Sequence, residues 1–448
     1  MLHLYSVSLG CPKNRVDTER ALAALVPFGP VVPVASPEEA DLVFINTCGF
    51  IAPAVEESVR AMMEAIDRVQ ALPEGERPLL AVAGCLVGRY GVDTLAPDLP
   101  EADLILDTNS VDSWGAALAA ALAGRGRAAR LRNGVANAPL RLLSTGPSYA
   151  WLKISDGCRH ACSFCTIPSI RGALRSTPAE ALRDEARELL EQGVKELILV
   201  AQDLTAWGTD LDIRHGLVSL LETLLPLRGL ERLRLMYLYP GGVTNDLLGF
   251  LRQAGPPFVP YFDVPLQHAA HNVLSRMGRP FAGKPREAVE RIRSHFPDAA
   301  LRTSIIVGFP GETDADFAEL RRFVEETRFH HLGVFAYEAE EGTPAAAMPD
   351  QIPEALKEER RAALMDIQSV ISEELLAPCL GERLPVLVDA PHPEWPGLHV
   401  GRTWFQAPEI DGATYVSGPG VIPGALVEAD IIETQTYDLV ALTDGDTA

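Results

Sequence analysis

Short apolar runs alternate with helical patterns in the first part of the chain. Apolar runs at residues 4–9, 42–46 and 79–83 predict β-strands, and stretches between them, such as residues 55–68, predict helices. Strands that alternate with helices are typical of an α/β fold with an open parallel sheet. We therefore expect a first domain of this kind over residues 1–130.

A cysteine follows each of these three predicted strands, and each cysteine has a glycine beside it. The cysteines are Cys11, Cys48 and Cys85. Because ligands gather at the carboxyl ends of parallel strands, we expect the three thiols to converge on one crevice. A single strand-end cysteine is more often a small buried residue, but three in equivalent positions predict a cluster-binding triad. The glycines would let the backbone approach a bulky ligand.

A second alternating series follows residues 131–147, which lack periodicity and predict a linker. Its six predicted strands are residues 149–154, 196–201, 233–237, 259–264, 303–307 and 333–337. Its predicted helices are residues 178–192, 217–225, 246–253, 285–294 and 316–326. Six β/α units predict a partial, open relative of the eight-stranded barrel, within a domain at residues 148–377 that ends in a charged helix at residues 353–377.

The last domain, residues 378–448, shows short apolar runs with turns between them. They lie at residues 384–388, 399–405, 414–417 and 426–436. This pattern predicts a small antiparallel β-barrel of the OB-like kind.

A second cysteine triad has the spacing C-x3-C-x2-C and follows the first barrel strand: Cys158, Cys162 and Cys165. Three thiolates on one loop can hold three irons of a 4Fe-4S cluster and leave the fourth iron open for reaction. The alternative is a structural zinc loop, which needs a fourth ligand. His160 is the near candidate, and it sits between two of the cysteines where the loop has little slack.

Charge and composition restrict the location and the partners. The longest apolar stretches have strand length, which predicts no membrane span, and no secretory signal is visible at the amino terminus, so we expect a cytoplasmic protein. An odd count of seven cysteines favours metal ligands over disulfides. The net charge of −22 argues against binding nucleic acid through a broad basic surface and permits a basic protein partner.

Several motifs resemble one family, the methylthiotransferases among the radical S-adenosylmethionine (SAM) enzymes. The central triad, with Phe164 before its last cysteine, is similar to the radical SAM signature. SLGCPKN, NTCGF and AGC, around the first triad, resemble the amino-terminal methylthiotransferase domain; CRHACSFCTIPSIRG and SIIVGFPGET are similar to the radical SAM domain, and the chain end resembles a TRAM domain. Residues 202–203, 265–279 and 401–412 look like the branch that modifies an aspartate of the twelfth small-subunit ribosomal protein.

This resemblance implies two 4Fe-4S clusters and SAM as cofactors. Cys158, Cys162 and Cys165 would hold the cluster that binds SAM, and the amino-terminal triad would hold an auxiliary cluster that carries the sulfur to be donated. The reaction would convert a C–H bond on the aspartate β-carbon to C–SCH3, with electrons from an external one-electron reductant. No acid or base residue is required, because no side chain deprotonates such a carbon at a useful rate.

The resemblance also places six residues near SAM, each with a plainer alternative. Phe164 would lie near the adenine, or pack in the loop core. Arg175 would meet the SAM carboxylate, or be a solvated surface residue. Gln202 and Asp203 would contact the SAM amino group, or simply cap a strand end.

The other two expected SAM contacts are Gly308 and Gly311, whose backbone would approach the adenosine; an ordinary glycine turn is the alternative. A departure from the family pattern is Thr177, where a basic residue is expected. His268 and His271 are expected to be helix-surface residues. Cys379 stands apart from both triads and is expected to be structural.

The carboxyl-terminal segment carries half of the net charge. From residue 373 to 448 there are thirteen acidic residues against two basic ones, a net charge of −11. TRAM domains usually bind RNA, which such a surface would repel, so we expect a basic ribosomal protein as partner, contacted through Glu409 and Asp411. The alternative to partner binding is an acidic tail that serves only solubility.

Two further functional classes stay open on the sequence. One is a tRNA methylthiotransferase of the MiaB-like branch. The other is a non-catalytic carrier with two clusters, which would favour complete sets of four cysteines rather than two triads.

Overall fold

The computed structural model describes residues 1–125, 139–280 and 284–444. The chain divides into two compact units. The first comprises Met1–Ser144, Asp156–His160 and Cys165–Arg175; the second comprises Thr145–Ser155, Ala161–Phe164 and Ser176–Ala448. Of the predicted linker, residues 131–138 lie outside the described residues, and residues 139–144 belong to the first unit.

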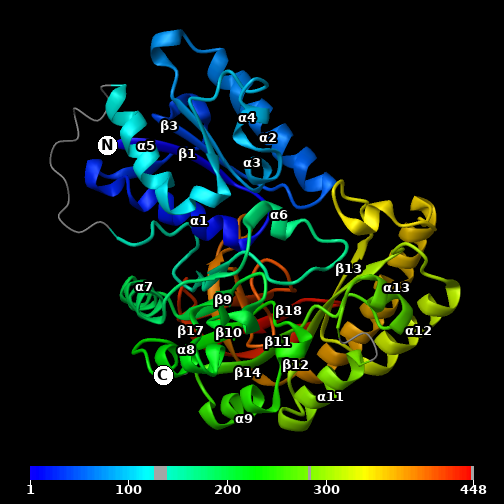
Figure 1. Ribbon diagram of the computed structural model, residues 1–448. Helices are drawn as coiled ribbons and strands as arrows, with labels where there is room; N and C mark the ends of the chain where they lie inside the picture. The colour runs from blue at the N-terminus through cyan, green and yellow to red at the C-terminus, as the bar shows by residue number, and fades with distance from the viewer. Residues whose placement is uncertain (126–138, 281–283, 445–448) are drawn as a thin grey trace. The chain divides into compact units, whose positions relative to one another are not determined.

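The first unit is built on a five-stranded parallel sheet, blue in Figure 1. In spatial order its strands are β2 (Val31–Pro33), β1 (Leu2–Ser8), β3 (Leu42–Thr47), β4 (Leu79–Gly84) and β5 (Leu104–Asp107). The expected open parallel sheet is confirmed. Strands β2 and β5 were not predicted, because runs of three and four residues show too little alternation to be recognised.

Helices cover both faces of this sheet, because successive residues of its buried strands point to opposite sides. Leu42 and Phe44 of β3 pack with helices α1 (Pro12–Ala23) and α5 (Trp114–Gly124). Val43 and Ile45 pack with α2 (Ala52–Gln70) and α3 (Cys85–Tyr90). The short helices α4 (Val92–Leu95) and α6 (Ile167–Arg171) complete the unit.

The second unit contains a six-stranded parallel sheet whose strands follow one another in chain order. They are β6 (Tyr149–Lys153), β9 (Glu196–Val200), β10 (Arg232–Leu235), β11 (Phe258–Asp263), β12 (Ala300–Val307) and β13 (His331–Ala336). Its helices are α7 (Ala179–Glu191), α8 (Gly216–Leu224), α9 (Asn245–Ala254), α10 (His271–Arg276), α11 (Pro285–His295) and α12 (Asp314–Thr327). Two-residue strands β7 (Ser155–Asp156) and β8 (Arg175–Ser176) flank the cysteine loop in sequence. Among the described residues β6 and β13 do not pair, which confirms the open, partial barrel.

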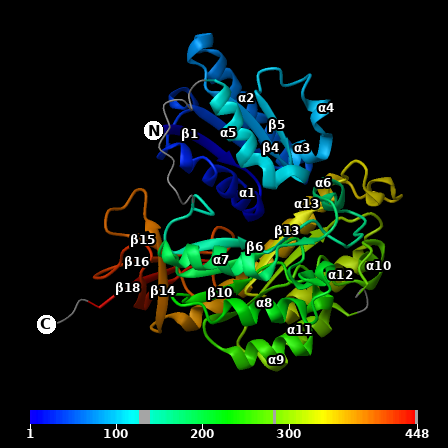
Figure 2. The same ribbon diagram turned by 60° about the vertical axis from the view of Figure 1, so that its left-hand side comes forward.

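Helix α13 (Glu354–Leu376) leads to a small closed β-barrel, orange to red in Figure 2. Around the ring its strands are β14 (Arg383–Pro391), β15 (His399–Arg402), β16 (Thr414–Ser417), β18 (Leu439–Leu442) and β17 (Leu426–Thr434). The expectation of a wholly antiparallel barrel is wrong in one pairing, since β16 and β18 are parallel. An odd number of strands cannot alternate in direction around a closed ring, so one parallel pair is unavoidable.

Buried ion pairs join this small barrel to the amino ends of the larger barrel's strands. Glu196, the first residue of β9, pairs with Arg234 at 2.7 Å and with Arg402 at 2.8 Å. Arg232, the first residue of β10, donates to the carbonyls of Arg402 at 3.0 Å and Pro385 at 2.7 Å. Because the arginines hold the pKa of the buried Glu196 carboxyl near 2, this carboxyl is ionised at neutral pH.

Within the described residues, no helix combines the length and the apolarity needed to cross a membrane.

His330 is a partly buried histidine whose titration links stability to pH. Its pKa is lowered to about 4, mainly by burial and also by His331 and Arg293, while Asp411 opposes them. Because the folded pKa lies below the unfolded value near 6.5, the unfolded chain binds the extra proton between these values. We predict that unfolding free energy falls by about 2 kcal/mol between pH 7 and pH 5 from this residue alone.

The measurement is denaturant unfolding of the wild type and His330→Gln at both pH values, in the same cluster state. His330→Gln should reduce the fall in unfolding free energy between pH 7 and pH 5. The control His271→Gln, at an exposed ring, should leave that fall unchanged. An equal change in unfolding free energy between the two pH values in the wild type and in His330→Gln would contradict the prediction.

Candidate functional site

The three cysteines of the first triad lie at the carboxyl ends of adjacent strands. Cys11 caps α1 after β1, Cys48 follows β3, and Cys85 begins α3 directly after β4. Burial is the main cause that raises the pKa of both Cys48 and Cys85, and the nearby Cys11 acts in the same direction; the pKa of Cys85 is raised to about 12. The three cysteines thus lie at adjacent strand ends, and the shared crevice expected from the sequence stays a prediction.

The glycines beside these cysteines admit neighbouring strand ends. A Cβ on Gly10, which has φ of +87°, would lie 2.6 Å from the Cys48 sulfur. A Cβ on Gly49 would lie 2.7 Å from the Cys85 carbonyl oxygen. These glycines let the cysteine-bearing strand ends approach one another, and their expected role in admitting a ligand stays a prediction.

The donor set fits an iron–sulfur cluster in its chemistry, because three thiols lie at adjacent strand ends, with Cys48 and Cys85 buried and Cys11 partly exposed. The described residues contain no group of three or more His, Cys, Asp or Glu side chains already placed to hold a metal ion. The thiols of Cys48 and Cys85 are neutral near pH 7 in the cluster-free chain, so cluster binding must displace their protons.

The loop of the second triad contributes Cys158 and Cys165 to the first unit and Cys162 to the second. In the first unit the Cys158 amide donates to the Gly172 carbonyl at 3.1 Å. In the second unit the Ser163 amide donates to the Met277 carbonyl at 3.1 Å. Backbone hydrogen bonds therefore fix the loop at its start and in its middle, and the three cysteines are partly exposed.

Phe164 packs against the apolar cluster of the second unit, which includes Leu274, Phe309 and Tyr337. The Arg279 guanidinium lies 5.7 Å from the Phe164 ring centroid. Phe164 therefore packs against this cluster while partly buried, and its expected contact with the adenine stays a prediction.

Gln202 follows β9 at its carboxyl end, where the sequence predicted SAM contacts. Both its amide oxygen and its amide nitrogen are buried without a hydrogen-bond partner in the protein. The Asp203 carboxylate, by contrast, caps a short helical turn by accepting from the Thr205 amide at 2.9 Å and hydroxyl at 2.7 Å. A buried, unpartnered amide fits a polar cofactor such as SAM, because desolvating it without a partner is costly.

The remaining predicted SAM contacts have other neighbours. A Cβ on Gly308 would lie 2.3 Å from Cγ of Lys357, and one on Gly311 would lie 1.6 Å from Nη1 of Arg276. Both glycines thus give space to side chains of the protein itself. Arg175 is 57% exposed and lies 3.9 Å from the exposed Asp112, a weak surface pair.

His268 is fully buried, so the prediction of a helix-surface residue is wrong. It lies in the loop before α10, where its Nδ1 accepts from the Ala270 amide at 3.0 Å and its Nε2 lies 3.4 Å from the Glu312 carboxylate. His271 is exposed, as expected, and Cys379 lies in a short turn after α13.

Asp411 is buried, which corrects its prediction as a partner contact. Its carboxylate is 1% exposed and accepts from the Tyr261 hydroxyl at 2.7 Å and the Ala407 amide at 2.8 Å, with Arg302 at 3.5 Å. Glu409 is exposed as a residue, but one carboxylate oxygen accepts from the Tyr149 hydroxyl at 2.7 Å. Both acids therefore help to hold the small barrel on the strands of the larger one.

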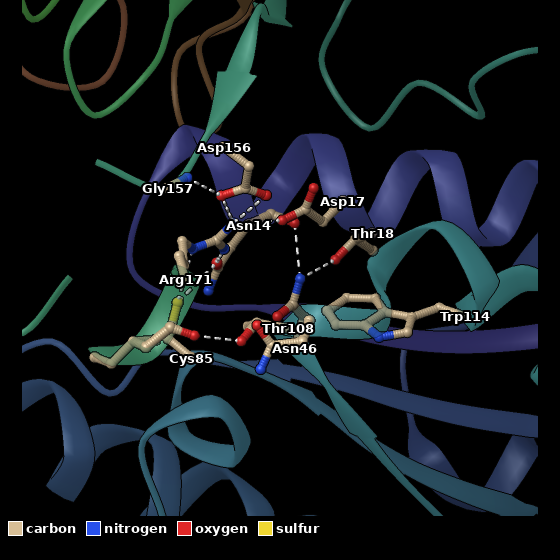
Figure 3. A network of polar contacts seen from close by, with 12 residues as sticks. Asn14, Asp17, Thr18, Asn46, Cys85, Thr108, Trp114, Asp156, Gly157 and Arg171 are labelled. Carbon is tan, nitrogen blue, oxygen red and sulfur yellow. Dashed lines mark hydrogen bonds and ion pairs between the residues drawn. The ribbon is translucent and has the colours of Figure 1, made fainter. Parts of the chain in front are cut away.

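Arg171 is the residue that the sequence analysis missed. It ends α6, is buried, and contacts Asp17, Asp156, Asn14 and Cys85, all in the first unit (Figure 3). The available signal was a charged residue six positions after Cys165, within a predicted cluster-binding run.

Comparison with protein families matches three consecutive parts of the chain. Residues 3–107 match the family described as "Uncharacterized protein family UPF0004", residues 152–324 match the "Radical SAM superfamily", and residues 380–443 match the "TRAM domain". Among solved structures, a radical S-adenosylmethionine methyltransferase, TsrM, from Kitasatospora setae has a TM-score of 0.56 at 16% identity. That similarity covers 89% of this chain and 78% of the other, and shows a common fold.

The open parallel barrel, the cysteine loop after its first strand and these matches define a radical SAM enzyme, which uses SAM and a 4Fe-4S cluster. Full-length relatives are "Ribosomal protein uS12 methylthiotransferase RimO" of Nitratidesulfovibrio vulgaris, 67% identical, and of Oleidesulfovibrio alaskensis, 64% identical. Each alignment covers 99% of this chain and 100% of the relative. The chain belongs to the RimO family of methylthiotransferases.

Replacing Gln202 should separate cofactor binding from stability. We predict that Gln202→Leu weakens SAM affinity about tenfold, because a hydrogen bond to a charged group contributes about 1.5–3 kcal/mol. The variant should be at least as stable as the wild type without SAM, because two unpartnered buried atoms disappear.

Equilibrium dialysis of SAM against anaerobically reconstituted protein measures the affinity. The matched control is Gln368→Leu, at a buried glutamine whose amide donates to the Phe329 carbonyl at 2.9 Å. That change should cost stability and leave SAM affinity unchanged. Unaltered SAM affinity in Gln202→Leu would count against a SAM contact there.

Proposed function

We propose that this enzyme adds a methylthio group to the β-carbon of an aspartate in ribosomal protein uS12. The observation that carries this proposal is the full-length similarity to uS12 methylthiotransferases, at 55–67% identity in the relatives from Nitratidesulfovibrio vulgaris, Oleidesulfovibrio alaskensis and Lawsonia intracellularis. The tRNA-modifying alternative is not favoured, because these full-length relatives act on a ribosomal protein by name. A cytoplasmic location follows from such a substrate.

In this proposal each triad holds one 4Fe-4S cluster. Cys158, Cys162 and Cys165 hold the cluster that binds SAM, and the amino-terminal triad holds the second cluster. When bound, these groups and SAM supply the radical and sulfur-transfer chemistry that an unactivated carbon requires, with electrons from an external reductant.

The protein's own residues bind and shield these groups. The unpartnered amide of Gln202 binds a polar part of SAM, and Phe164 closes the cysteine loop onto the apolar cluster of its unit. The loop backbone is held by hydrogen bonds at Cys158 and at Ser163, each within its own unit.

The acidic carboxyl-terminal domain is the proposed holding site for the basic substrate. Opposite charge steers association and fixes orientation, whereas phosphates of RNA would be repelled. Exposed acids on the described part of this domain are Glu382, Glu394, Glu409, Glu428, Glu433 and Asp444. Glu428 and Glu433 share strand β17, which makes them better candidates for partner contact than the buried Asp411.

The two triads should have separate functions. Anaerobically reconstituted wild type should hold about eight irons, as two clusters of four. Replacing Cys158, Cys162 and Cys165 by Ala should halve the iron and abolish reductive SAM cleavage. Replacing Cys11, Cys48 and Cys85 by Ala should also halve the iron but preserve SAM cleavage, while the methylthio product disappears.

Iron analysis and mass spectrometry of SAM products and uS12 measure these outcomes. Iron content unchanged by either triple substitution would contradict the ligand assignment. Methylthio product from the amino-terminal triple variant would show that the second cluster is not the sulfur donor.

Charge reversal on β17 should weaken capture of uS12. We predict that Glu428→Lys with Glu433→Lys raises the Kd for uS12 severalfold at low salt and less at high salt, without lowering uncoupled SAM cleavage. The control is Glu290→Lys with Glu319→Lys, which makes the same charge change at exposed sites on the larger barrel.

Binding of uS12 and of tRNA by the full-length protein is the measurement. The control pair should affect uS12 binding less than the β17 pair does. Methylthio-adenosine formed in tRNA by the wild type would overturn the substrate assignment.

A further inference from the structure

Arg171 is a buried cation that touches a cysteine of the proposed second cluster. Its side chain is 1% exposed. Its Nη1 lies 3.1 Å from the Asp17 carboxylate and 3.0 Å from that of Asp156, and its Nε donates to the Cys85 sulfur at 3.3 Å (Figure 3). All of these residues belong to the first unit.

The two carboxylates fix the direction of the guanidinium. Asp17 is fully buried and the Asp156 side chain is 9% exposed. Both carboxylates pair with the same nitrogen, Nη1 of Arg171. The guanidinium is planar, so holding Nη1 on one side determines where Nε points. With Nη1 held by Asp17 and Asp156, Nε faces the Cys85 sulfur.

Asn14 holds the guanidinium at a second point. Its Nδ2 donates to the carbonyls of Leu9 and Thr47, both at 2.9 Å, so its Oδ1 must face the other way. That oxygen accepts from Arg171 Nη2 at 2.5 Å. The orientation of Arg171 is therefore fixed by the same strand ends that carry the cysteines.

We propose that Arg171 is a positioning residue that hydrogen-bonds the Cys85 sulfur and sets how readily the second cluster accepts an electron. The proposal rests on the proposed function, in which Cys11, Cys48 and Cys85 hold that cluster. Reduction adds one electron from an external reductant and breaks no bond. A positive charge and an N–H donor at a ligand sulfur stabilise the more negative, reduced form and so raise its reduction potential.

The test uses a protein that carries the second cluster alone. Cys158, Cys162 and Cys165 are replaced by Ala, the protein is reconstituted anaerobically, and the cluster is titrated with dithionite while electron paramagnetic resonance reports its reduced form. Adding Arg171→Lys keeps a positive charge but removes the directed Nε donor. At fixed potential the ratio of reduced to oxidised cluster should fall about tenfold, a shift of about 59 mV for a one-electron couple.

Arg141→Lys is the matched control in the same background. Arg141 is as buried as Arg171 and pairs with the buried Glu19 in the same unit. This control should leave the potential unchanged. A shift of equal size in Arg141→Lys would show that loss of any buried arginine perturbs the cluster, and would overturn the proposal.

If the Arg171→Lys variant binds no cluster, a second measurement tests the proposal on protein that keeps Arg171. In the same background with native Arg171, exchange into deuterated water should remove one strongly coupled proton from the electron–nuclear double resonance spectrum of the reduced cluster. Absence of that proton, or an unchanged potential in Arg171→Lys with full iron content, would overturn the proposal. Failure of the background protein to bind iron would instead contradict the cluster assignment of the proposed function.

Discussion

Buried charges can persist only beside opposite charges, and this requirement joins distant parts of the chain. Glu19 and Arg141 are 122 residues apart, Asp17 and Arg171 are 154 apart, and Glu196 and Arg402 are 206 apart. Removing one member of such a pair costs about 3–5 kcal/mol, because an uncompensated charge is left in a poorly solvated interior. Each pair therefore favours a single arrangement of the segments that it joins, within its own unit.

Periodicity and strand-end position predicted much of the fold and six candidate cluster ligands. The runs at residues 42–46 and 79–83 are apolar on both faces, which is typical of central parallel strands, and their ends located Cys48 and Cys85. Sequence alone left two interpretations open for Gln202 and missed Arg171. The first is notable for lacking a partner and the second for having four, and both properties depend on contacts between segments that no local pattern encodes.

The run at residues 401–412 shows why charge counting misplaced the partner contacts. Arg402 and Asp411 belong to an acidic domain by composition, yet both point inward to Glu196 and Tyr261. A motif that distinguishes one branch of a family can thus be a joint between domains. Arg402 and Asp411 contact the strands that the small barrel covers, whereas Glu428 and Glu433 on β17 are exposed.

The contact between the small barrel and the strand starts also sets the distance that a substrate bound by the small barrel must span. Glu196 and Arg232 begin their strands, whereas Gln202 follows the end of β9, so the small barrel and the proposed SAM contact lie at opposite ends of one sheet. Strands of five to eight residues, β9 and β12, span about 17–26 Å at about 3.3 Å per residue. A partner held by the small barrel must therefore present its target on a segment long enough to span that length. Tethering at one end then raises the local concentration of the target at the other, so weak contacts at each end combine into useful avidity.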